Sequence, residues 1–308
     1  GAVRVGIDGD RIATIWIDSP GTSVNTLSTA TWDGLDAAVG QIEARKPRGV
    51  VIVSAKPRSF IAGADLFELD AMTDAVLAAW LARGQAILDR VAALPMPTVA
   101  AIQGDALGGG LEVALACRYR IVIDEARIKL GLPETTLGLV PGWGGTFRLP
   151  RLVGIERALA LLVSGKSLAP REAAEIGLVD RVVERDDLLR VATECMRSDF
   201  LPPPLASENA SHVLDVCGRF RQATRERSGD HLPAPLRVID IVETGIRDGH
   251  DAAMEAERAG LVELRRSAAG KQLLRMFFLR TAAKKKAMAE AAGTARPVQS
   301  VVVLGGGT

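Results

Sequence analysis

The sequence predicts an α/β protein, because short apolar strands alternate with helical segments over residues 1–190. The segment Gly49–Ala55 is apolar and rich in β-branched residues, which is typical of a strand buried on both faces. Segments with apolar residues at helical spacing precede and follow it. Pro95 and Pro97 end the second of these, and a further strand is predicted at Thr98–Gln103. Strand, helix, strand, helix, strand in this order favours a parallel sheet with right-handed crossovers.

Length and composition narrow the class of protein. The 308 residues, 48% of them hydrophobic, suffice for one large or two modest domains. A net charge of 38 − 37 = +1 argues against a nucleic-acid-binding protein, which needs a basic excess. No uncharged apolar run approaches the roughly 18–20 residues that span a bilayer, so membrane association is not indicated. Three cysteines at irregular spacing fit a reducing compartment, so we expect a cytoplasmic protein.

The first elements follow from local patterns. Residues 12–18 are expected to form a strand, which Ser19-Pro20-Gly21 ends. Ser28 is the expected cap of the next helix, which Lys46-Pro47 ends. The apolar face of that helix is formed by Trp32, Leu35, Val39 and Ile42. A second, longer helix is predicted from about Leu66 to Leu94.

The middle of the chain continues the alternation. After Gly104 come a glycine cluster, an apolar helix and a strand around Tyr119–Ile123. Further helices are predicted over 154–164 and 170–177, followed by a short strand at Leu178–Glu184.

Past residue 200 the character of the sequence changes. Leu201–Pro204 and Pro233–Pro235 are interpreted as linker, on either side of polar sequence with little periodicity. From Leu236 to about Glu290 the chain returns to helix in at least two pieces. Ser300–Leu304 is expected to be a strand that runs into Gly305-Gly306-Gly307.

The positions of the histidines exclude whole classes of chemistry. His212, His231 and His250 are the three histidines of the chain, so any chemistry in residues 1–211 proceeds without imidazole. This excludes a Ser-His-Asp triad and a His-rich metal site from that region. Carboxylates, backbone dipoles and a few lysines and arginines remain.

One carboxylate, Glu112, interrupts the apolar segment Ala106–Cys117, which we expect to be a buried helix. An unpaired buried charge costs roughly several kcal/mol, so Glu112 needs a partner or a purpose. Gly108, Gly109 and Gly110 leave the helix entrance open to another molecule, where N–H groups carry the positive end of the helix dipole. Such donors are what an oxyanion hole requires. The alternative is a glycine-rich turn before a helix whose Glu112 meets an internal arginine.

A second candidate element, Arg58–Asp65, follows the strand Gly49–Ala55 directly. Small residues between the carboxyl end of a parallel strand and a helix lie where α/β folds bind ligands. The backbone N–H of Ala64 is therefore a candidate for the second donor of an oxyanion hole. The alternative is an ordinary turn in which Asp65 caps the helix, and this segment taken alone favours the alternative.

A third element, Leu130–Thr146, contains one acidic residue, Glu134, among apolar and small residues. Glu134 follows Glu112 by 22 positions with a strand between them, so both side chains are candidates to face one cavity. Two carboxylates in a low-dielectric pocket have pKa values that are raised and separated, which lets them exchange protons near neutral pH. The alternative, two unrelated surface glutamates, is hard to reconcile with the apolar context of both.

Taken together, these segments resemble the crotonase (enoyl-CoA hydratase/isomerase) superfamily. The matching motifs lie within residues 5–190 and are specific as a set: Ala62-Gly63-Ala64-Asp65, Gly108-Gly109-Gly110-Leu111-Glu112, Leu132-Pro133-Glu134, Pro141-Gly142-Trp143-Gly144-Gly145-Thr146 and Ala174-Glu175-Ile176-Gly177-Leu178-Val179-Asp180. The resemblance implies a spiral of ββα units with a C-terminal helical extension.

The resemblance also implies roles for individual residues. Glu112 and Glu134 correspond to the two catalytic glutamates of the hydratases, and the N–H groups of Ala64 and Gly109 to the oxyanion hole. We further predict that neighbouring motif residues contact the substrate, namely Ala62, Gly63, Asp65, Gly108, Pro133, Gly142 and Trp143.

The implied reaction is hydration of a trans-2-enoyl-CoA to a 3-hydroxyacyl-CoA in fatty-acid β-oxidation, with Δ3-Δ2-enoyl-CoA isomerisation as a secondary activity. It needs no metal or organic cofactor, because coenzyme A is part of the substrate. Two alternatives stay open at this point. One is an isomerase, thioester hydrolase or decarboxylase of the same superfamily, and the other is a non-catalytic acyl-CoA-binding module.

The flanking sequence is similar to the α-subunit family of the bacterial multifunctional β-oxidation complexes. The similarity is carried by Val24-Asn25-Thr26-Leu27, Arg148-Leu149-Pro150-Arg151, Met276-Phe277-Phe278-Leu279 and Lys284-Lys285-Lys286. Val301–Gly307 fits the first strand and glycines of an NAD-binding dehydrogenase domain. This implies a hydratase domain at 1–190, a helical and linker region at 191–297 and the start of a truncated dehydrogenase domain at 298–308. It also implies an oligomer or a thiolase β subunit as partner, and NAD only downstream.

Overall fold

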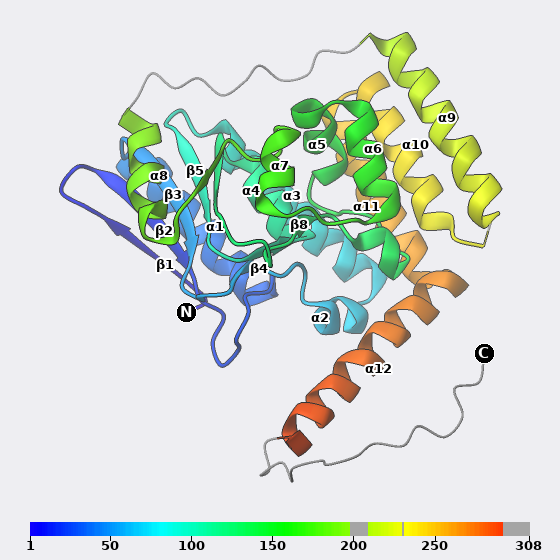
Figure 1. The fold of residues 1–308 in the computed structure, drawn as a ribbon, viewed down its shortest axis with the longest axis horizontal. Coiled ribbons are helices and arrows are strands. Elements are labelled where there is room, and N and C mark those ends of the chain that lie inside the picture. Colours follow the sequence, from blue (N-terminus) through cyan, green and yellow to red (C-terminus); the bar gives the residue numbers. More distant parts are fainter. Residues whose placement is uncertain (198–208, 230, 292–308) are drawn as a thin grey trace, which may run out of the picture.

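The computed structural model describes residues 1–197, 209–229 and 231–291, and there it confirms the predicted α/β class (Figure 1). Its larger sheet has six strands in the order β1-β2-β3-β5-β7-β9. The first pair is antiparallel and the others are parallel, as expected for strands joined by helical crossovers. The strands are β1 (Val3–Ile7), β2 (Ile12–Ile17), β3 (Gly49–Ser54), β5 (Thr98–Ile102), β7 (Tyr119–Ile123) and β9 (Arg181–Val183).

A second, smaller sheet consists of three short parallel strands in the order β4-β6-β8. They are β4 (Ser59–Ile61), β6 (Asp105–Leu107) and β8 (Leu130–Gly131). Because the strands are parallel, their carboxyl ends lie at one edge of the sheet. The three sequence motifs that contain Ala64, Gly109 and Glu134 follow directly from these three ends.

In the first 197 residues the predicted cap of the first helix is confirmed, and one predicted helix is corrected. Ser28 caps α1, and its Oγ accepts from the N–H of Thr31. The single helix predicted from Leu66 to Leu94 is two helices, because the Oγ1 of Thr73 caps a new helix after extended Met72. These helices and 3-10 turns are α1 (Thr29–Arg45), α2 (Leu66–Ala71), α3 (Asp74–Ala93), α4 (Gly109–Ala116), η1 (Glu134–Leu137), α5 (Gly145–Val153), α6 (Ile155–Ser164), α7 (Pro170–Glu175), η2 (Arg185–Asp187) and α8 (Leu188–Arg197).

Beyond residue 208 the structure corrects the interpretation as linker. Pro233 and Pro235 lie in the first turn of α10, where a missing N–H costs no helical hydrogen bond. The polar segment before them forms α9, which buries Val213, Val216, Cys217 and Thr224. The helices here are α9 (Ala210–Ser228), α10 (Pro233–Arg247), α11 (His250–Arg266) and α12 (Ala268–Ala291). The predicted linker Leu201–Pro204 and the strand Ser300–Leu304 with its glycines lie outside the described residues.

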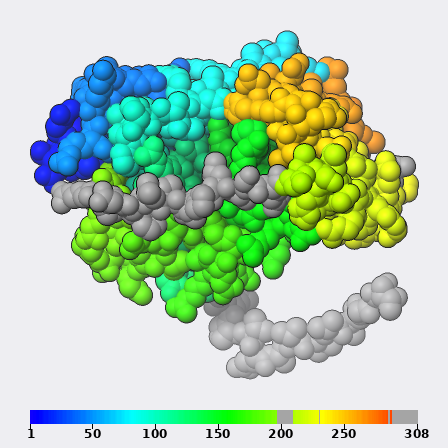
Figure 2. Space-filling model, turned by 90° about the horizontal axis from the view of Figure 1, so that it is seen from above, coloured from blue at the N-terminus to red at the C-terminus, as the bar shows by residue number. Residues whose placement is uncertain are grey.

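The C-terminal helices pack onto the body of the molecule. Figure 2 shows gold and orange residues of α10 and α11 against cyan and green residues, and α11 contacts both α3 and α5. Helix α12 extends away from the rest of the molecule in Figure 1. None of the helices in the described ranges combines the length and apolarity needed to cross a bilayer. The domain boundary at residue 190 stays a prediction.

A buried amide, Asn25, ties the two sheets together. Its side chain is fully buried and donates to the carbonyls of Ile17 and Phe60, each at 3.0 Å, and to Ser54 Oγ at 2.7 Å. Its Oδ1 accepts from the N–H of Ser19 at 2.8 Å. The end of β2, the end of β3 and β4 are thereby held at a fixed spacing.

We predict that Asn25→Ala lowers the free energy of unfolding by about 2–4 kcal/mol, because it leaves several buried polar groups without partners. Chemical denaturation followed by circular dichroism measures this. Val24→Ala, at the exposed neighbouring position, is the matched control. Equal stability of the two variants would contradict the role given to Asn25.

Candidate active site

Three loops, each at the carboxyl end of a strand of the small sheet, enclose a cavity of about 70 Å³. The loop after β4 contributes Ala62–Ala64, the loop after β6 contributes Gly108 and Gly109, and the loop after β8 contributes Pro133 and Glu134. The N–H of Gly108 donates to the carbonyl of Gly131 at 2.9 Å, which fixes the second loop against β8.

The structure brings together every sequence-predicted site residue except Asp65. The cavity is lined by Ala62, Gly63, Ala64, Leu66, Leu69, Gly108, Gly109, Glu112, Pro133, Glu134, Leu137, Leu139, Val140, Gly142, Trp143 and Leu261. Asp65 instead caps α2, where its Oδ1 accepts from the N–H groups of Phe67 and Glu68. The part of the alternative in which Asp65 caps the helix is therefore confirmed.

Glu112 is held by backbone amides and not by an internal arginine. It lies in the first turn of α4 and is fully buried. Its Oε1 accepts from the N–H of Trp143 at 2.7 Å and from the N–H of Gly145 at 2.8 Å. Its Oε2 is buried, and no described residue gives it a hydrogen bond. One oxygen is thus anchored and the other is left for a ligand.

Glu134 begins η1 and lies over the glycine turn. A Cβ added to Gly108 would come within 2.8 Å of Glu134 Oε1, so the carboxyl group needs a glycine there. The residue as a whole is partly exposed, but its Oε2 is buried and has no hydrogen-bond partner among the described residues. Both acids of the cavity therefore keep one unpaired oxygen.

Two amide groups beside these acids are also free to donate. Within the part of the chain that the structure describes, no backbone acceptor takes the N–H of Ala64 or of Gly109. Gly109 is the first residue of α4, whose aligned peptides make this N–H a favourable donor to negative charge. A Cβ at Gly109 would lie 2.5 Å from the ring of Trp143, so only glycine fits there.

Burial changes the acidity of both glutamates. Removal from water raises the pKa of Glu112 to about 8, the charge of Glu134 adds to this, and the two backbone hydrogen bonds oppose it. Burial likewise raises the pKa of Glu134 to about 8, with a smaller contribution from Glu257. Two carboxyl groups of this kind exchange protons near neutral pH, which ordinary surface carboxylates do not.

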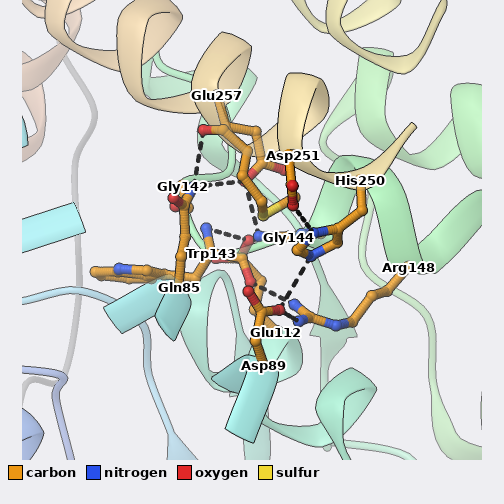
Figure 3. A network of polar contacts seen from close by, with 12 residues as sticks. Gln85, Asp89, Glu112, Gly142, Trp143, Gly144, Arg148, His250, Asp251 and Glu257 are labelled. Carbon is orange, nitrogen blue, oxygen red and sulfur yellow. Dashed lines mark hydrogen bonds and ion pairs between the residues drawn. The ribbon is translucent and has the colours of Figure 1, made fainter. Parts of the chain in front are cut away.

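Sequence reasoning missed a third buried acid, Glu257, on α11. Figure 3 shows the loop from Gly142 to Gly144 between Glu257 on one side and Glu112 on the other. Glu257 Oε2 accepts from the N–H of Gly144 at 2.7 Å, and Oε1 accepts from the N–H of Thr146 at 3.0 Å. Several other acidic residues lie near Glu257 in the sequence, so its charge does not distinguish it as a buried residue.

A partly buried ion-pair network supports the same loop. Arg148 Nη1 donates to the carbonyl of Trp143 at 2.7 Å, and its Nη2 pairs with Asp89 at 2.5 Å. His250 Nε2 lies 3.0 Å from the same Asp89 oxygen (Figure 3). Across the described ranges, no group of three or more His, Cys, Asp or Glu is arranged to hold a metal ion.

Comparisons with known proteins bear on the family and the fold of the chain. The family model described as enoyl-CoA hydratase/isomerase matches residues 8–228. An enoyl-CoA hydratase from Bacillus anthracis is 28% identical, with 91% of this chain and 97% of that one covered and a TM-score of 0.60. Human mitochondrial delta3-delta2-enoyl-CoA isomerase is 25% identical, covers 92% and 100% of the two chains and has a TM-score of 0.69.

The raised pKa values of the buried glutamates predict a pH dependence of stability. The pKa of Glu112 lies above its ordinary 4.5. Between pH 4.5 and about 8 the folded state therefore keeps a proton that the unfolded chain has already released. The free energy of unfolding should therefore fall as pH rises through this window. One such group contributes at most about 1.4 kcal/mol per pH unit.

Urea unfolding of the wild type and of Glu112→Gln at several pH values checks this. We expect the variant to gain stability relative to the wild type as the pH rises. Glu255→Gln, on the exposed face of α11, is the control and should follow the wild type. If the free energy of unfolding changed with pH in the same way for the wild type and Glu112→Gln, the raised pKa of Glu112 would be contradicted.

Proposed function

We propose that this chain, which belongs to the enoyl-CoA hydratase/isomerase family, adds water across the double bond of a trans-2-enoyl-CoA thioester. The observation that carries the proposal is the pair of unpaired oxygens, Glu112 Oε2 and Glu134 Oε2, on two acids that line one cavity. A lone acid would suffice to move a proton between carbons, whereas addition of water needs a group for the water and a group for the carbon.

Binding of the thioester carbonyl is assigned to the N–H groups of Ala64 and Gly109. These donors line the cavity and are not used by the surrounding backbone. A carbonyl held by both becomes a better electron sink, so the β-carbon becomes electrophilic and enolate charge is stabilised in the transition state. The apolar wall of Leu66, Leu69 and Leu137 excludes water and strengthens these hydrogen bonds.

Glu112 in its ionised form is the proposed general base for water. Its anchored Oε1 fixes the carboxylate, and its free Oε2 accepts a proton from water while the water oxygen bonds to the β-carbon. Glu134 in its protonated form gives its proton to the α-carbon as the enolate collapses. Water thereby supplies OH to one carbon, and its remaining proton resides on Glu112 until exchange between the acids resets them.

Within the same proposal, the product is a 3-hydroxyacyl-CoA and the reaction is the hydration step of fatty-acid β-oxidation. The chemistry uses carboxyl groups and amide donors of this chain, and coenzyme A enters as part of the substrate. Membership of a multifunctional complex, with a thiolase β subunit as partner, stays a prediction carried by the flanking motifs.

A Δ3-Δ2-enoyl-CoA isomerase is the second candidate. The human enzyme of that name has a TM-score of 0.69 over 92% of this chain. Glu134 beside the same amide donors is placed to take a proton from one carbon and return it to another, without a water molecule.

The direct test of hydration follows the loss of enoyl-thioester absorbance when crotonyl-CoA is added. We expect Glu112→Gln and Glu134→Gln each to lower kcat by roughly 10²–10⁴-fold, since each removes one proton-transfer group. Glu255→Gln is the matched control and should retain wild-type rates. Wild-type activity in the double variant would overturn the proposal, and tight thioester binding without turnover in the wild type would favour a binding module.

An assay of isomerase activity distinguishes the proposed roles of Glu112 and Glu134. With a 3-enoyl-CoA substrate, Glu134→Gln should abolish formation of the 2-enoyl product, because the shuttling carboxyl is gone. Glu112→Gln should retain most of this activity, because no water has to be activated. An equal loss in both variants would show that one acid alone does not perform the isomerisation.

A further inference from the structure

Four successive backbone amides at the start of α5 are shared alternately by two buried carboxyl groups. The N–H groups of Trp143 and Gly145 donate to Glu112 Oε1, at 2.7 and 2.8 Å. Those of Gly144 and Thr146 donate to Glu257, at 2.7 and 3.0 Å. Neither acid can shift without loosening the peptide units that hold the other.

Glu257 is built into this position from several sides. It is fully buried, and Thr146 Oγ1 adds a further hydrogen bond at 2.5 Å. Gln85 Nε2, from α3, lies 3.5 Å from Glu257 Oε2 and also donates to the carbonyl of Gly142 at 2.9 Å. Arg258 in turn donates to Gln85 Oε1 at 2.5 Å, which fixes the orientation of that amide.

Burying a carboxyl group of this kind merely to join two helices is costly, since apolar side chains would join them with less desolvation. Glu257 lies beyond residues 8–228, which the family model matches, and on a helix that supplies one lining residue of the cavity, Leu261. The arrangement is explained if the conformation of residues 143–146 matters for the cavity.

We propose that Glu257 is a positioning residue for Glu112: it holds the loop so that two amides fix Glu112 Oε1 and direct Glu112 Oε2 to the substrate water. This rests on the proposed hydration and extends it to α11. Glu257 does not line the cavity, so its role is to position Glu112 through the loop.

The charge of Glu257 gives the proposal a signature in the pH profile. The ionisable groups that face it or its hydrogen-bond partners are Glu112 on α4, Glu134 on η1, Arg148 on α5 and Arg258 on α11. Negative charge on Glu257 raises the pKa of Glu134, and Glu257 and Glu112 repel each other in the same way. Burial raises the pKa of Glu257 to about 8, so this charge is present on the alkaline side, and its removal should move the alkaline limb of the kcat profile to lower pH.

The experiment compares Glu257→Gln with Glu255→Gln, a control two residues earlier on the exposed face of α11. In Glu257→Gln the side-chain NH₂ replaces one acceptor oxygen, so the loop loses a hydrogen bond from the N–H of Gly144 or of Thr146. We expect kcat for crotonyl-CoA to fall about tenfold or more, because misplacement of a catalytic group is costly, while KM changes less than about twofold. Wild-type kcat with an unmoved pH profile would overturn the proposal.

A milder variant covers the case in which Glu257→Gln does not fold, as judged by circular dichroism. Thr146→Val removes the hydroxyl that donates to Glu257 but keeps the backbone N–H. We expect a several-fold loss of kcat at constant KM, and a wild-type kcat in this variant would count against the proposal.

A readout without catalysis separates this inference from the proposed function. NMR titration of protein labelled with ¹³C at glutamate carboxyl carbons identifies the Glu112 signal by its absence in Glu112→Gln. In Glu257→Gln, or in Thr146→Val if the former does not fold, its midpoint should differ from wild type. A wild type that leaves crotonyl-CoA unchanged would refute the hydration, while an unmoved Glu112 midpoint would refute the positioning role.

Discussion

The hydrogen bonds from the start of α5 to Glu112 are the interaction on which the candidate site depends. A carboxyl group taken out of water loses the solvent that stabilises its charged form, and other hydrogen-bond donors replace part of it. The N–H groups of Trp143 and Gly145 do so at a single oxygen, Oε1. The positive end of the α5 peptide dipoles adds to their effect. Because one oxygen takes both donors, the other stays available in the cavity, and the proposed role of Glu112 as general base rests on this asymmetry.

The rest of the fold serves to bring distant segments to this point. Three parallel strands of a small sheet end at one edge, and each end delivers one wall of the cavity. Glycine is required where these walls approach one another: Gly63 has a φ of +111°, and Gly108 has a φ of +53° beneath the carboxyl group of Glu134. Asn25 ties this small sheet to the larger one. The positions of donors and acids are therefore set by backbone geometry and depend little on flexible side chains.

Much of the candidate site was predictable from the sequence, because its residues differ in polarity or size from the segments around them. Glu112 and Glu134 were identified because each is a single charge in an apolar segment, and Gly109 because glycines at a helix entrance expose amides. The break between α2 and α3 was missed because the apolar spacing continues across Thr73, although its side chain is a good cap. Glu257 and Gln85 were missed because polar residues are common in both helices. Only tertiary packing shows which of these polar groups are buried.

The most direct test of the account is a crystal structure with a bound, unreactive acyl-CoA thioester. The account predicts the thioester oxygen within hydrogen-bonding distance of the N–H groups of Ala64 and Gly109. It also predicts a water molecule, or the ligand atom that replaces it, between Glu112 Oε2 and Glu134 Oε2. A thioester bound elsewhere, or a cavity in which packed side chains separate the two carboxyl groups, would contradict it.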